Sequence, residues 1–122
     1  MREFKNVRQP EEGRRRLFIG EFFRLYVWYD YAHKSSKRDE RIVGFELTYG
    51  GRYKGIVRYT ERTNYLTHNH LIDDERSEVL SMSDMYGEDK GKLSKHVFEL
   101  FEAEWLPPSI KNYVINNLQR LL

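Results

Sequence analysis

The segment Phe22-Phe23-Arg24-Leu25-Tyr26-Val27-Trp28-Tyr29-Asp30-Tyr31 decides the fold class of this chain. Six of its ten residues are aromatic, and side-chain type alternates with the period of two that a β-strand produces. The odd positions from Phe23 to Tyr31 are all apolar or aromatic, and they form a face suited to burial. The even positions from Arg24 to Asp30 mix rings with charges. We therefore expect one face to join the core and the other to be covered or to bind a partner.

Four other segments alternate in the same way and predict a five-stranded sheet. The predicted strands are Arg14–Ile19, Phe22–Tyr31, Arg41–Tyr49, Lys54–Glu61 and Tyr65–Ile72. In the third of them, Val43, Phe45, Leu47 and Tyr49 are expected on one side of the strand and Ile42 on the other. Gly50-Gly51 lies between two alternating runs and predicts a tight hairpin turn. The connections are short, which predicts an antiparallel meander, because parallel pairs need long crossovers.

The C-terminal segment changes to helical spacing. A helix is expected over Lys95–Trp105 with Ser94 as its cap, and a second helix is expected to begin at Pro108 or Ser109 and to reach the C-terminus. Strands followed by helices predict an α+β fold with both helices packed on one face of the sheet. The expected core joins strand residues to helical residues. The strand residues are the odd positions from Phe23 to Tyr31 with Val43, Phe45, Leu47, Val57 and Tyr59, and the helical residues are Val97, Phe101, Tyr113, Val114 and Leu118.

Length and composition indicate a single domain. The chain has 122 residues, which predicts a sheet over about 14–72, an acidic loop over 73–92 and a helical pair over 93–122. Residues 1–62 hold 15 Lys and Arg against 9 Asp and Glu, whereas residues 63–122 hold 6 against 10. Cysteine is absent, which excludes disulfides, thiolate metal sites and thiol catalysis. No apolar run reaches the ~20 residues of a membrane span, so a cytoplasmic protein without a membrane association is expected.

Arginines and rings supply the first candidate site. Arg14 and Arg16 share one face of their predicted strand, where two guanidinium groups suit phosphate or carboxylate. The mixed face of the aromatic strand adds Arg24, Tyr26 and Trp28, with Arg58 from a later strand. Such a face suits stacked bases, a protein partner or a second subunit. Asp30 and Glu46 would repel phosphates, which favours the protein interface.

His68 and His70 supply a candidate metal site. Residues at i and i+2 of a strand point to the same face, so both imidazoles could meet one ion. The segment Asp73-Asp74-Glu75 follows and could add an oxygen ligand. The alternative is a pair of exposed or hydrogen-bonded histidines near a strand end.

The pattern Phe4-x-Asn6-Val7-Arg8-Gln9, with Gly13–Phe18, Val27–Asp30 and Ile42–Tyr49, resembles a group of small bacterial proteins of unknown function. The resemblance implies a bacterial, cytoplasmic chain that stands by itself, and it implies no activity and no catalytic residue.

The residues themselves favour a non-catalytic binding module, without a cofactor, that associates with a protein partner or with itself as a dimer. The first alternative is an anionic ligand or nucleic acid held by Arg14, Arg16, Arg24 and Trp28. The second is a metal-dependent enzyme centred on His68 and His70.

Overall fold

The structure is a computed structural model, and it describes residues 1–10, 13–31, 40–51, 54–71 and 92–122. The predicted acidic loop at 73–92 falls outside the described residues except for Lys92. The strands are β1 (Arg2–Phe4), β2 (Arg14–Ile19), β3 (Phe23–Tyr31), β4 (Glu40–Tyr49), β5 (Lys54–Thr60) and β6 (Tyr65–Leu71). The helices are α2 (Lys95–Glu102) and α3 (Pro108–Gln119).

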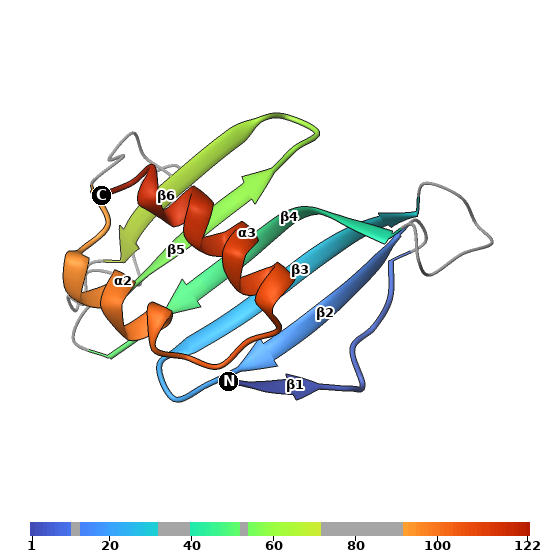
Figure 1. Cartoon of the computed structure of the whole chain (residues 1–122), viewed down its shortest axis with the longest axis horizontal. Coiled ribbons are helices and arrows are strands. Elements are labelled where there is room, and N and C mark those ends of the chain that lie inside the picture. The colour runs from blue at the N-terminus through green and yellow to red at the C-terminus, as the bar shows by residue number, and fades with distance from the viewer. Residues whose placement is uncertain (11–12, 32–39, 52–53, 72–91) are drawn as a thin grey trace.

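The strands form one antiparallel meander in the order β1-β2-β3-β4-β5-β6, which Figure 1 shows as a single twisted sheet. The predicted meander is confirmed, but the sheet has six strands rather than five. The strand that the sequence did not predict is β1, which is too short to display a period. A contact distant in sequence anchors it: the amino group of Met1 lies 2.9 Å from a carboxylate oxygen of Glu104 and 3.1 Å from the carbonyl oxygen of Trp105.

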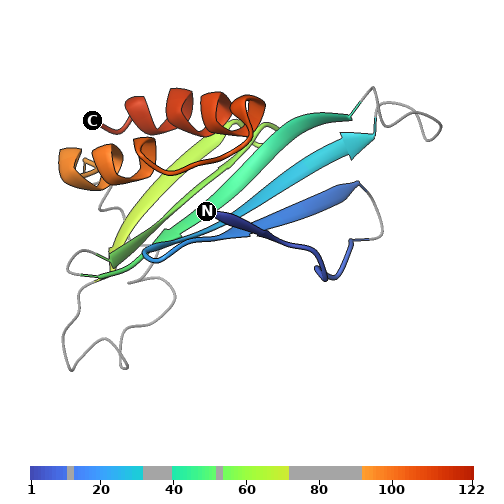
Figure 2. The same ribbon diagram turned by 60° about the horizontal axis from the view of Figure 1, so that its bottom comes forward.

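Both helices pack on the same face of the sheet, as Figure 2 shows, and the core lies between the two layers. Phe101 meets Phe23 edge to face, with ring centroids 5.5 Å apart. Leu25, Phe45, Val57, Val114 and Leu118 are fully buried. The predicted core is confirmed at these positions, with one exception at Val43. Within the described residues, neither helix is long and apolar enough to cross a membrane.

The helix boundaries follow from local chemistry. The side chain of Ser94 accepts a hydrogen bond from the backbone N–H of His96, which caps α2 as predicted. This helix ends at Glu102, three residues earlier than expected. Pro108 begins α3, where its fixed φ is already helical and its missing N–H leaves no hydrogen bond unmade.

A β-bulge in β4 corrects one predicted face. Trp28 pairs with Gly44 but Tyr29 pairs with Ile42, so Val43 is an extra residue in β4. The residues of β4 that precede Val43 therefore point to the opposite faces from those that strict alternation predicts. Ile42, rather than Val43, therefore packs against the core. The antiparallel pairing of β4 with β5 around Gly50-Gly51 is confirmed, and residues 52–53 of the connection lie outside the described residues. Of the two glycines only Gly51 has a positive φ, at 96°.

Candidate functional site

The face of the sheet opposite the helices is the main candidate surface, and it is called the uncovered face here. Among the described residues no helix lies on it (Figure 2). Pairing across the strands places its members in rows, because directly opposed residues share a face. One row runs Leu17, Tyr26, Glu46, Arg58, Thr67, and the next runs Arg15, Trp28, Gly44, Thr60, Tyr65.

Positive charge predominates on the uncovered face. By register, the six strands place six cations there: Arg2, Arg15, Arg24, Arg41, Lys54 and Arg58. They place two carboxylates there, those of Asp30 and Glu46. By this count the strand residues of the face have four more cations than carboxylates. One of these cations, Arg41, forms an ion pair with Glu61 at 3.3 Å.

Two aromatic rings stand together at the middle of this face. Tyr26 and Trp28 have ring centroids 6.5 Å apart and planes inclined by 20°, and both side chains are half-buried. The guanidinium carbon of Arg15 lies 5.3 Å from the centroid of the Tyr26 ring, within the range of a cation–π contact. The Nε of Arg15 donates to the carbonyl oxygen of Arg8 at 2.6 Å, which fixes the guanidinium beside the rings.

The two carboxylates of the uncovered face each have a cationic neighbour. Glu46 accepts hydrogen bonds from Arg58, one of them from Nε at 3.0 Å, and the two groups form an ion pair. Asp30 lies opposite Arg41 in the register of β3 and β4. The repulsion of phosphate that the sequence suggested is therefore largely cancelled at Glu46. Among the described residues, Arg24 has no carboxylate within ion-pair distance.

A hollow of about 610 Å³ adjoins Trp28 where β2 and β4 begin and where β3 and β5 approach their ends. Its volume lies within the ~300–1,000 Å³ of small-ligand pockets. Gly44, which pairs with Trp28, has no room for a side chain, because a Cβ there would stand 2.6 Å from the carbonyl oxygen of Tyr59. Three arginines and two acids belong to its lining: Arg14, Arg41, Arg62, Asp30 and Glu61.

The structure divides the predicted arginine set. Arg14 and Arg16 share a face, as predicted, but it is the face that carries the helices, whereas Arg24, Tyr26, Trp28 and Arg58 share the uncovered face. Arg14 still reaches the hollow beside Trp28. Arg16 lies neither on the uncovered face nor in the lining of the hollow.

Arg16 is engaged by a carboxylate of β1. Its Nε and Nη2 donate to Glu3 at 2.9 and 2.8 Å, and this pair lowers the pKa of the Glu3 carboxyl to about 2. Hydrogen bonding to the ionised carboxylate causes the shift, since it stabilises the charged form. We assign Arg16 to the attachment of β1 to β2.

The predicted histidine pair lies on the helix-bearing face. His68 and His70 share that face, as their spacing predicted, with ring centroids 4.3 Å apart. His68 is 1% exposed, and its Nε2 lies 2.6 Å from the hydroxyl of Tyr49, which is 3.5 Å from Nδ1 of His70. Burial raises the pKa of Tyr49 to about 12, so this hydroxyl keeps its proton at neutral pH.

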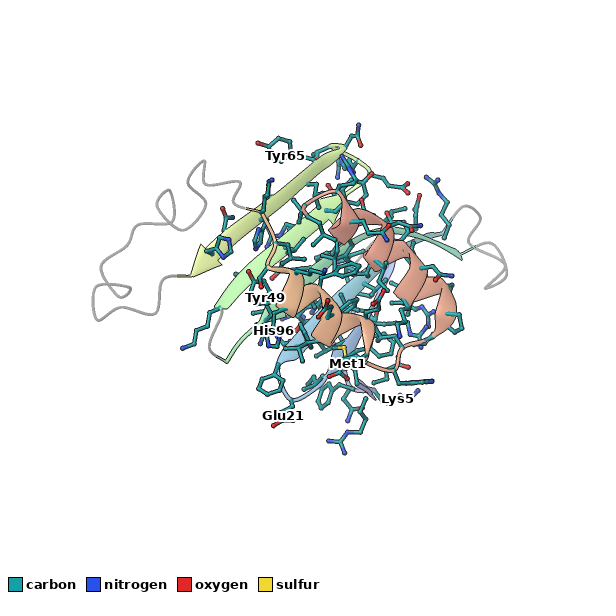
Figure 3. The ribbon with its side chains drawn as sticks, turned by 60° about the vertical axis from the view of Figure 1, so that its left-hand side comes forward. Met1, Lys5, Glu21, Tyr49, Tyr65 and His96 are labelled. Carbon is teal, nitrogen blue, oxygen red and sulfur yellow. The ribbon has the colours of Figure 1, made fainter. Side chains whose placement is uncertain are left out.

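Space for this Tyr49–His68–His70 cluster comes from a glycine. The Tyr49 ring crosses Gly55, where a Cβ would stand 2.4 Å from the ring carbon that bears the hydroxyl. Tyr49 also lines a small hollow with His96, and both are labelled in Figure 3. Within the described residues no group of three His, Cys, Asp or Glu side chains could hold a metal ion. Asp73-Asp74-Glu75, the predicted oxygen ligands, lie outside the described residues.

Sequence reasoning missed three contributors to these sites. Arg15 is not among the residues that the sequence pattern singles out, and its position opposite Trp28 follows only from the register of β2 and β3. Tyr49 was expected in the core and gave no sign of contacting a histidine. Gly44 does not lie in a predicted turn. A single glycine inside an alternating strand indicates a bulge or a close approach of another backbone, and this was the signal that could have identified it.

Comparison of the chain with protein-family models, with curated proteins and with solved structures finds no match. Its function must therefore be inferred from the geometry described above.

Proposed function

We propose that this protein is a non-catalytic binding module that holds an anionic partner on the uncovered face of its sheet. The observation that supports this proposal is the charge of that face, where six cations accompany two carboxylates. A surface of one predominant sign attracts partners of the opposite sign and accelerates their association.

The same charge bears on self-association, the partner that the sequence favoured. Two copies that met face to face would oppose two surfaces of equal positive sign, which costs free energy rather than supplying it. Self-association of this chain is therefore expected at an outermost strand such as β6, where main-chain groups can pair with a second copy. Light scattering over a range of concentrations tests this expectation, and a monomer at every concentration would contradict it.

The test of the proposed function uses anionic polymers as probes. Polyglutamate, polyphosphate and mixed-sequence single-stranded DNA are titrated at low salt against the wild-type protein, Arg24→Gln and Lys95→Gln. The two variants lose the same charge, but Lys95 is exposed on α2, in the helical layer.

We expect at least one polymer to bind, and we expect Arg24→Gln to weaken binding more than Lys95→Gln does. The proposal fails if none of the polymers binds, or if both variants weaken binding equally. Equal loss would mean that net charge, rather than the uncovered face, governs the interaction.

A further inference from the structure

We infer that the anionic partner is a single-stranded nucleic acid whose bases stack on Tyr26 and Trp28; the inference rests on the proposed function and names its ligand class. Charge alone would suit an acidic peptide or a polyphosphate equally well. The rings distinguish these ligands, because every nucleobase has a face that stacks and an acidic side chain has none.

The ring geometry suits a planar guest. Tyr26 and Trp28 occupy successive same-face positions of β3, and their planes are inclined by 20° with centroids 6.5 Å apart. Two stacking contacts at the optimal carbon–carbon separation require ~7–8 Å, so a modest side-chain rotation would admit a base between the rings.

The cations surround the rings at positions where a backbone would pass. Arg15 lies over Tyr26 and directly opposite Trp28, and its guanidinium plane is itself a surface on which bases stack. Arg24 precedes the ring pair on the same face of β3, whereas the hollow beside Trp28 adds Arg62 at the far end. A phosphodiester chain running along β3 would therefore meet Arg24 before the rings. After them it would meet Arg62 in a hollow that Asp30 and Glu61 also line, so the chain must pass Arg62 at a distance from the Asp30 carboxylate.

A duplex does not satisfy this arrangement. The bases of a duplex stack on one another, so their faces are hidden from a protein side chain. Open sheets with exposed rings accordingly hold single strands whose bases are splayed out. Glu46, which argued against nucleic acid when the sequence was considered alone, is neutralised by Arg58.

The experiment uses a protein in which Trp28 is the single fluorescent indole. Trp105 is 68% exposed at the connection between the helices, away from the uncovered face, so Trp105→Phe removes the other indole at small structural cost. A single-stranded oligonucleotide of about ten nucleotides falls within the ~4–16 that comparable sheets hold. It should quench the Trp28 emission, whereas the matched duplex and polyglutamate should not.

Two substitutions separate stacking from charge. Trp28→Leu, which keeps an apolar side chain against Gly44, should weaken binding of the labelled oligonucleotide about 5- to 150-fold, the range for loss of one stacked base. Arg24→Gln should lower the slope of log K against log salt by about 0.7, the value for one phosphate of a single strand. Lys95→Gln should leave that slope unchanged. Circular dichroism and melting temperatures confirm that each variant is folded.

The outcomes distinguish this inference from the proposed function. If polyglutamate or the duplex binds as tightly as the single strand, or if Trp28→Leu binds normally, the assignment to nucleic acid is wrong while an anion-binding face stands. If none of the probes binds, both are wrong.

Discussion

Replacing Tyr49 by Phe tests whether the hydrogen bond to His68 holds β4 and β6 together through the buried face. Tyr49 is 2% exposed and His68 is 1% exposed, and their polar atoms are 2.6 Å apart. The substitution removes the hydroxyl and leaves the ring over Gly55. Nε2 of His68 then loses this partner in a place that water does not readily reach. The free energy of unfolding should fall by about 1–3 kcal/mol, the cost of an unsatisfied buried polar group.

Urea unfolding followed by circular dichroism measures this loss. The midpoint should fall at an unchanged m-value, because the surface exposed on unfolding stays the same. The melting temperature should drop by roughly 2–8 °C for each kcal/mol, across the domain sizes that bracket this chain.

Tyr59→Phe is the matched control. Its hydroxyl donates to the side chain of Asn64 at 3.3 Å in an exposed contact, so water replaces the lost bond and the cost should stay within about 0.5 kcal/mol. Combining Tyr49→Phe with His68→Leu should cost less than the sum of the two single changes, since each disrupts the same hydrogen bond. Equal costs for Tyr49→Phe and Tyr59→Phe, or strict additivity in the double variant, would refute the reasoning.

Three further predictions concern other parts of the fold. The neighbouring arginine lowers the pKa of Glu3 to about 2 from 4.5, so the ion pair stabilises the fold above the higher value and this stability is lost as the pH falls toward the lower. The melting temperature of Glu3→Gln should therefore lie below that of the wild type at neutral pH and approach it near pH 2, and a constant difference would contradict the pair. Gly44→Ala should lower the free energy of unfolding by ~1–3 kcal/mol in urea, because its Cβ would meet the carbonyl oxygen of Tyr59; an unchanged midpoint would speak against the bulged register. Zinc ions should leave the melting temperature unchanged, since a tyrosine hydroxyl already engages His68, whereas a rise that His70→Ala abolishes would establish a metal site.

The sequence could predict the architecture because the patterns that encode it are local. The alternation along β3 to β6 and the helical spacing after Ser94 both arise because apolar side chains on one face of each element are buried. The buried odd positions of β3 and the packing of Phe101 and Val114 follow from the same signal. The shared face of His68 and His70 also follows from strand geometry alone.

The candidate sites depended on contacts that no local pattern contains. The bulge at Val43 inverts the faces at the start of β4, and only pairing with β3 reveals it. Register likewise decides that Arg15, rather than Arg14 or Arg16, lies with Trp28 on the uncovered face.

Residues distant in sequence then decide what each charged or polar group does. Glu3 occupies Arg16 and Arg58 neutralises Glu46, so one arginine is withdrawn from binding and one repulsive carboxylate is cancelled. Tyr49 on β4 reaches His68 on β6 across the intervening strand β5. The sequence by itself determined which faces of the main strands and helices are buried, because hydrophobicity belongs to each residue. The tertiary structure alone decided which charges remain available, because pairing belongs to two residues and to the distance between them.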